Sequence, residues 1–81
     1  MTHEEFYQKL VQIIARETGW SETAIVRQSK FEADLGFDSL DRVCTLMEVE
    51  NQFGVSLPEG LDETFVTVGD ALNWLVENTP S

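Results

Sequence analysis

The chain has little cysteine, histidine, proline or basic charge, and it has no long apolar run. Its 81 residues include one cysteine, one histidine, two prolines and five lysines or arginines. One cysteine excludes an internal disulfide framework. One cysteine and one histidine are also too few for a zinc site built from these two residue types. No apolar stretch is long enough to cross a membrane, and the N-terminus lacks a basic region followed by an apolar one. We therefore expect a cytoplasmic protein with no metal site and no membrane insertion.

Acidic side chains, in contrast, are abundant. Fifteen aspartates and glutamates against five basic residues give a net charge of −10. The first 30 residues hold four acids and four bases, so the whole excess falls on residues 31–81, where Arg42 is the only base. Such a surface repels nucleic-acid phosphates, and it is either a solvated face or a surface that attracts basic partners. With 42% apolar residues the chain is too hydrophobic for a disordered tail, and its length fits one domain over residues 1–81.

Two long helices are predicted from apolar residues at helical spacing between capping signals. Thr2 and Glu5 have the spacing of a capping box, and the apolar pattern after them predicts a helix over residues 3–18. Asp38 has the position of an N-cap before a second apolar pattern, which predicts a helix over residues 39–53.

Two shorter elements are predicted in the last third of the chain. Residues 61–65 allow one turn of helix and little more. Thr67 and Asp70 repeat the capping spacing and predict a last helix over residues 68–78, with Pro80 preventing its continuation.

A long connection without sustained periodicity separates the two long helices. A structureless segment such as 19–37 is uncommon in a compact domain and is usually functional. Its apolar residues are expected to anchor it to the core: Trp20, Ile25, Val26, Phe31 and Leu35. No segment alternates long enough for a strand. The predicted fold is all-α, a small four-helix bundle of three main helices and one short one, with a long loop between the first two.

The helix over residues 39–53 is predicted to have a broad apolar side and a polar side. The apolar stripe expected to face the core is Leu40, Val43, Leu46, Met47, Val49 and Phe53. The outer side is expected to hold Asp41, Arg42, Thr45, Glu48 and Asn51. Cys44 is expected to be a half-buried helix residue and not a reactive thiol.

Ser39 is the candidate functional residue. A serine in the first turn of a helix lies beside free backbone amides and the positive end of the helix dipole, which favours an attached phosphate by roughly 0.3–1 kcal/mol. The ordinary alternative is that Asp38 or Ser39 is only a helix cap. A catalytic serine is disfavoured because the only histidine, His3, lies near the terminus and no Gly-x-Ser-x-Gly elbow is present. We therefore expect no enzyme.

Three segments carry a family resemblance. Residues 31–41, FEADLGFDSLD, resemble the phosphopantetheine attachment motif of acyl carrier proteins. Residues 53–58, FGVSLP, resemble the segment after that family's second helix, and residues 67–71, TVGDA, resemble the start of its final helix. The three matches occur in order at suitable spacing, and the similarity in helix pattern covers essentially the whole chain.

This resemblance implies a carrier. In the family, a phosphopantetheinyl transferase attaches 4′-phosphopantetheine from coenzyme A to the serine that matches Ser39, between Asp38 and Leu40 of this chain. Acyl groups then travel as thioesters on the arm in fatty-acid, polyketide or specialised lipid synthesis. Acyl chains of many members fold back between the helices, so four residues are either ordinary core or candidates for lining such a cleft: Leu40, Val43, Met47 and Leu72.

The resemblance also implies partners and leaves alternatives open. Asp41, Arg42, Glu48 and Glu50 are predicted to face the transferase and acyl-loading, ketosynthase or acyltransferase enzymes with basic surfaces, and the carrier is expected to be a monomer. Arg42 stands where the family usually has a small or aliphatic residue, which suggests a specialised carrier. The alternatives are a peptidyl carrier or, in a different class, an acidic helical module that binds proteins or divalent ions.

Overall fold

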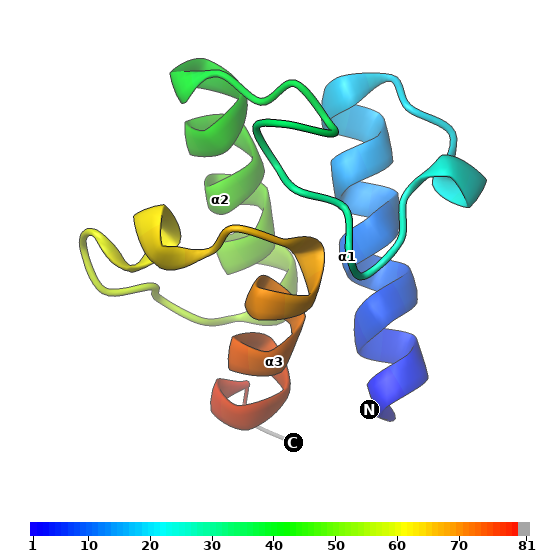
Figure 1. Ribbon diagram of the computed structural model, residues 1–81. Helices are drawn as coiled ribbons and strands as arrows, with labels where there is room; N and C mark the ends of the chain where they lie inside the picture. The colour runs from blue at the N-terminus through cyan, green and yellow to red at the C-terminus, as the bar shows by residue number, and fades with distance from the viewer. Residues whose placement is uncertain (80–81) are drawn as a thin grey trace.

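The computed structural model describes residues 1–79, and its regular elements are helices joined by loops. The elements in chain order are α1 (His3–Thr18), the 3-10 turn η1 (Glu22–Ala24), α2 (Ser39–Phe53), the 3-10 turn η2 (Leu61–Thr64) and α3 (Val68–Asn78). Figure 1 shows α1 and α2 running in opposite directions beside one another, with α3 against the half of the bundle where α1 begins. The predicted all-α class and the bounds of the three main helices are confirmed.

The fourth predicted element is a single 3-10 turn. η2 begins after Gly60, which has a φ of 85°, and it ends where the amide of Phe65 bonds the carbonyl of Asp62 at 3.2 Å. No side chain caps it, and a segment of four residues is too short for a cooperative α-helical ladder. Among residues 1–79 the only β-type pairing is an isolated antiparallel bridge between Lys30 and Thr67. Pro80, predicted to stop the last helix, lies outside the described residues.

Each main helix begins with a capping box in which two residues satisfy each other's backbone amides. The pairs are Thr2 with Glu5, Asp38 with Asp41, and Thr67 with Asp70. These bonds satisfy amides that have no partner inside the helix, so they fix where each helix starts.

The core is formed mainly by α1 and α3. The buried apolar residues of these two helices are Phe6, Leu10, Val11, Ile13, Ile14, Val68, Ala71, Leu72 and Leu75. From α2, only Val49 and Phe53 are buried apolar residues. Phe53 stacks on Phe6 of α1 with ring centroids 5.7 Å apart, so the C-terminal half of α2 is the part held against the core.

The predicted core stripe of α2 is wrong at three of its six residues. Leu40, Val43 and Met47 are 69%, 52% and 64% exposed, because neighbouring helices cover only one side of α2. Thr45, predicted to face outward, is buried, and Cys44, predicted to be half-buried, is exposed.

The long loop is anchored as predicted by Ile25, Phe31 and Leu35, which are all buried. Trp20 and Val26 are about half exposed and do not act as buried anchors. The indole of Trp20 instead lies at the surface and donates from Nε1 to the carbonyl of Leu35 at 3.1 Å.

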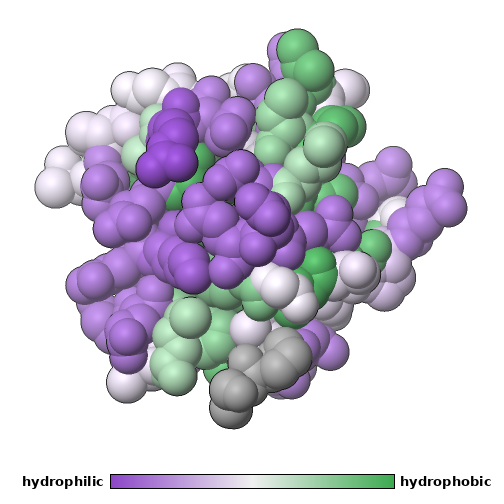
Figure 2. Space-filling view, turned by 180° about the vertical axis from the view of Figure 1, so that it is seen from behind, coloured by the Kyte–Doolittle hydropathy of each residue, from purple (hydrophilic) through white to green (hydrophobic). Residues whose placement is uncertain are grey.

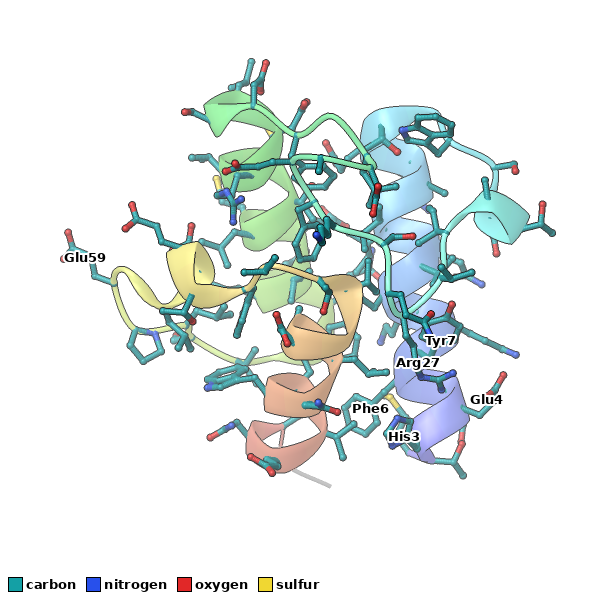
Figure 3. All side chains as sticks on the ribbon, viewed as in Figure 1. His3, Glu4, Phe6, Tyr7, Arg27 and Glu59 are labelled. Atoms are coloured by element: carbon teal, nitrogen blue, oxygen red, sulfur yellow. The ribbon has the colours of Figure 1, made fainter. Side chains whose placement is uncertain are left out.

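The middle of the loop is attached to α1 and to the start of α3. The Arg27 guanidinium lies 4.3 Å from the centre of the Tyr7 ring, and the Tyr7 hydroxyl donates to the carbonyl of Ile25 at 3.1 Å (Figure 3). Three backbone bonds join the loop to the start of α3: Phe31 N to Val66 O, Val68 N to Ser29 O, and Gly69 N to Arg27 O. The loop is therefore a fixed part of the fold.

Asp70 makes the start of α3 sensitive to pH. Its carboxylate accepts hydrogen bonds from the amides of Thr67 and Val66 at 3.0 and 2.9 Å, and these bonds, that of Thr67 first, lower the pKa of Asp70. A carboxyl with a lowered pKa stabilises the fold above its unfolded pKa, and this stabilisation is lost as the pH falls through its folded pKa. Asp70→Asn keeps an oxygen acceptor but removes the negative charge at the start of α3, so we expect it to lower the melting temperature at pH 7 by about 1–8 °C, which corresponds to the roughly 0.3–1 kcal/mol of a charge at a helix N-terminus.

The difference between wild type and Asp70→Asn should shrink as the pH falls below about 4, the ordinary pKa of an aspartate, and should vanish once the pH is below the lowered pKa of folded Asp70. Thermal melts at several pH values measure this. Glu77→Gln, an exposed neutralisation on the same helix, serves as the control and should change little. If the melting temperatures of Asp70→Asn and the wild type differed by the same amount at all pH values, the charge of Asp70 would not be the cause of the stabilisation.

Candidate functional site

Ser39 is the first residue of α2, and its side chain is exposed. The preceding residue, Asp38, caps the helix: its Oδ1 accepts from the amide of Asp41 at 2.8 Å, and Asp41 Oδ2 accepts from the amide of Asp38 at 3.2 Å. Within residues 1–79 no acceptor is found for the amides of Ser39 and Leu40. The Ser39 hydroxyl therefore stands beside two free donors and has no capping role of its own.

The residues before Ser39 hold it in place. Gly36 has a φ of 71°, a left-handed conformation that glycine adopts without strain, and it turns the chain towards α2. Phe37 is 8% exposed; its ring packs on that of Phe31 at a centroid distance of 5.1 Å, and its amide bonds the Phe31 carbonyl at 2.9 Å. The chain thus passes from a buried anchor at Phe37 to an exposed hydroxyl at Ser39 within two residues.

A mixed apolar and acidic surface continues from Ser39 along α2. We define the α2 face as the exposed Leu40, Val43 and Met47 with the half-buried Asp41 and Glu48. Figure 2, which views the molecule from behind, shows a band of hydrophobic side chains descending from the top over α2. The spacing of three and four between these exposed apolar residues is also that of a core stripe, so the sequence predicts them to face the core and not the surface.

All four predicted partner-facing residues make hydrogen bonds within the protein, and two of them, Arg42 and Glu50, bond to residues outside α2 and its cap. The Arg42 side chain is 19% exposed; its Nη2 pairs with Glu32 Oε1 at 3.0 Å, and its Nη1 donates to the carbonyl of Asp62 at 2.9 Å. Glu50 accepts from the amide of Leu57 at 2.8 Å. Their role towards partners stays a prediction, and both connect α2 to the loops that flank it.

A cavity of about 50 Å³ lies between the three helices and their loops. Its walls include Leu10 of α1, Thr45 and Val49 of α2, and Leu75 of α3. None of the four candidates for lining a cleft, Leu40, Val43, Met47 and Leu72, lines it, so the cleft alternative is wrong for this cavity. The first three face solvent, and Leu72 is packed in the core.

Comparison with known proteins gives one consistent result. The phosphopantetheine attachment site family matches residues 8–75 of the chain. The acyl carrier protein of Chloroherpeton thalassium is 42% identical over 95% of this chain and 96% of that protein, and the acyl carrier protein of Chlorobium phaeobacteroides is 39% identical over 95% and 99%. The chain belongs to the acyl carrier protein family. A solved structure of the acyl carrier protein from Enterococcus faecalis agrees in fold, with a TM-score of 0.80 and 31% identity over 96% of this chain and 99% of that one.

The prosthetic group of an acyl carrier protein is 4′-phosphopantetheine, and the start of α2 fits such a group. An acceptor for the phosphate has to be an exposed hydroxyl, and Ser39 provides one. The free amides of Ser39 and Leu40 are suited to a phosphate anion. Among residues 1–79, no helix is both long and apolar enough to cross a membrane.

Proposed function

We propose that this chain carries acyl groups as thioesters on a 4′-phosphopantetheine arm attached to Ser39 Oγ. When bound, the arm supplies the thiol on which the acyl group is held. The observation that carries the proposal is the exposed Ser39 hydroxyl at the first turn of a helix that its neighbour Asp38 already caps. Ser39 is thus available for modification without loss of a helix-capping bond.

The start of α2 is suited to the charge of the attached phosphate. The positive end of the helix dipole favours the anion by roughly 0.3–1 kcal/mol. The amides of Ser39 and Leu40 have no acceptor within residues 1–79 and point out of the first turn. Asp38 and Asp41 bond each other's amides, which keeps both carboxylates engaged at the cap.

The same proposal assigns a carrier role and no catalysis to this chain. A nucleophilic serine needs a base beside it, and Figure 3 shows His3 at the end of the molecule opposite the start of α2. A single domain over residues 1–81, a monomeric state and a cytoplasmic location belong to the proposal, as does work in fatty-acid, polyketide or specialised lipid synthesis.

Incubation with coenzyme A and a broad-specificity phosphopantetheinyl transferase tests the proposal. The intact mass is expected to increase by one phosphopantetheinyl group. An unchanged mass, with a known carrier modified in the same tube, would contradict the proposed function.

The proposed contact surface for the transferase and the acyl-transferring enzymes is the α2 face. Its exposed apolar residues supply area that can be buried, and its acids attract basic surfaces during encounter. Asp41 also caps α2, so Glu48 is the cleaner position at which to test the charge.

Glu48→Lys is expected to slow phosphopantetheine transfer by roughly two- to tenfold at low salt, and less at high salt, because it reverses a charge that steers association. Initial rates at several ionic strengths measure this. Glu77→Lys makes the same charge change on exposed α3 surface and should leave the rate almost unchanged. Equal slowing by both variants would show that only net charge matters and that the α2 face is not the contact surface.

A further inference from the structure

The cavity between the helices contains one hydroxyl that has no partner. Thr45 is 6% exposed, and its Oγ1 has no hydrogen bond among residues 1–79. In the described part of the chain one other buried side-chain atom lacks a partner, Thr79 Oγ1, and it lies at the end of α3 and does not line the cavity. Apart from Thr45, Arg42 and Asp62, every residue of the cavity wall is apolar. Thr45 thus places a buried hydroxyl oxygen without a partner in a mostly apolar wall.

A helical threonine usually avoids this situation by bonding the carbonyl four residues earlier. Thr18 of α1 does so, with its Oγ1 2.7 Å from the carbonyl oxygen of Ile14. Thr45 makes no such bond to Asp41. A buried hydroxyl without a partner is unfavourable compared with valine, which has the same shape. Stability of the bundle therefore does not explain the hydroxyl, whereas recognition of a polar ligand does.

We propose that Thr45 makes this carrier selective for acyl chains that bear a hydroxyl or keto oxygen, which hydrogen-bonds to Oγ1 inside the cavity. The inference rests on the proposed function, because the chain enters from the arm on Ser39. Ser39 and Thr45 lie on the same helix, roughly 9 Å apart along its axis. A hydroxyl both donates and accepts, so Thr45 can bond an alcohol or a ketone.

The size of the cavity and the charges at its wall limit which acyl chains can bind there. A space of about 50 Å³ accommodates a short acyl segment, since a single water already requires roughly 10–15 Å³. The cation in the wall, Arg42, is already bonded to Glu32 and to the carbonyl of Asp62, and the Glu32 carboxylate beside it disfavours an anionic cargo. The cavity is thus suited to a short, neutral, oxygenated chain.

Matched pairs of acyl forms test the proposal. The transferase can load butyryl or β-hydroxybutyryl, and hexanoyl, β-hydroxyhexanoyl or δ-hydroxyhexanoyl, from the corresponding coenzyme A thioesters. In the wild type, at least one hydroxylated form should melt about 4–8 °C above its unsubstituted partner, the shift expected for one buried hydrogen bond. The difference should vanish in Thr45→Val and persist in Thr45→Ser. Equal melting within all wild-type pairs, or a difference that survives in Thr45→Val, would overturn the proposal.

The unmodified protein provides a second measurement. Thr45→Val should raise its melting temperature, because an unbonded hydroxyl is replaced by a methyl group, whereas Thr18→Val should lower it by breaking the bond to Ile14. A lower melting temperature for Thr45→Val would mean that the hydroxyl is bonded in the folded protein, and the inference would fail. Failure of the wild type to take up phosphopantetheine would refute the carrier function itself. Normal loading, with equal melting temperatures for the hydroxylated and unsubstituted acyl forms, would refute only the selectivity.

Discussion

Ser39→Ala is expected to abolish the addition of phosphopantetheine. With coenzyme A and a transferase, the wild type should gain the mass of one group and the variant none. The reason is chemical, because the phosphate ester forms on the Ser39 oxygen and alanine has no oxygen to offer. The fold should be unaffected, since the α2 cap is made by Asp38 and Asp41 and not by Ser39.

The matched control is Ser56→Ala, which removes another exposed serine hydroxyl, in the loop after α2. This variant should be modified as fast as the wild type. Circular dichroism spectra of both variants should overlay that of the wild type. A mass gain in Ser39→Ala would place the attachment on a different side chain and refute the assignment of Ser39.

Phe37→Ala is expected to have the largest effect on stability of any change near the site. Truncation of a buried phenylalanine typically costs about 3–5 kcal/mol, against a total free energy of unfolding of about 5–15 kcal/mol for a domain. The melting temperature should fall by more than about 10 °C. Because Phe37 anchors the chain directly before the Asp38 cap, loading of Ser39 should also slow at temperatures where the variant is still folded.

Trp20→Ala provides the comparison for Phe37→Ala. The Trp20 indole is 46% exposed, and the substitution removes its bond to the Leu35 carbonyl in the same loop. We expect a loss of about 1 kcal/mol and normal loading. If folded Phe37→Ala were modified at the wild-type rate, Phe37 would contribute to the core alone and would not position Ser39.

The start of each helix could be predicted because its cause is local. A Thr or Asp followed three residues later by Glu or Asp places both capping groups within one turn, whatever the rest of the chain does. The pairs at Thr67 and Asp38 show both bonds of the box. For the same reason the position of Ser39 in the first turn of α2 followed from the sequence.

The orientation of α2 could not be predicted, because it depends on which neighbours cover it. Periodicity identifies an apolar stripe but not its covered part, so Met47 and Val49 look equally suited to the core although one is exposed and the other buried. Thr45 was assigned to the surface from its polarity. The direction of the Arg42 side chain depends on Glu32 and Asp62, ten and twenty residues away in sequence.

The backbone bonds between the first loop and the start of α3 limit how the bundle can change shape. Residues 27–31 and 66–69 are joined by three such bonds, so these two segments have to shift together. The stretch from Val55 to Phe65 contributes Leu57, Asp62 and Phe65 to the cavity wall and contains only one 3-10 turn. If the cavity expands around a bulkier acyl chain, this stretch is therefore expected to move, whereas the two bonded segments keep their positions relative to each other.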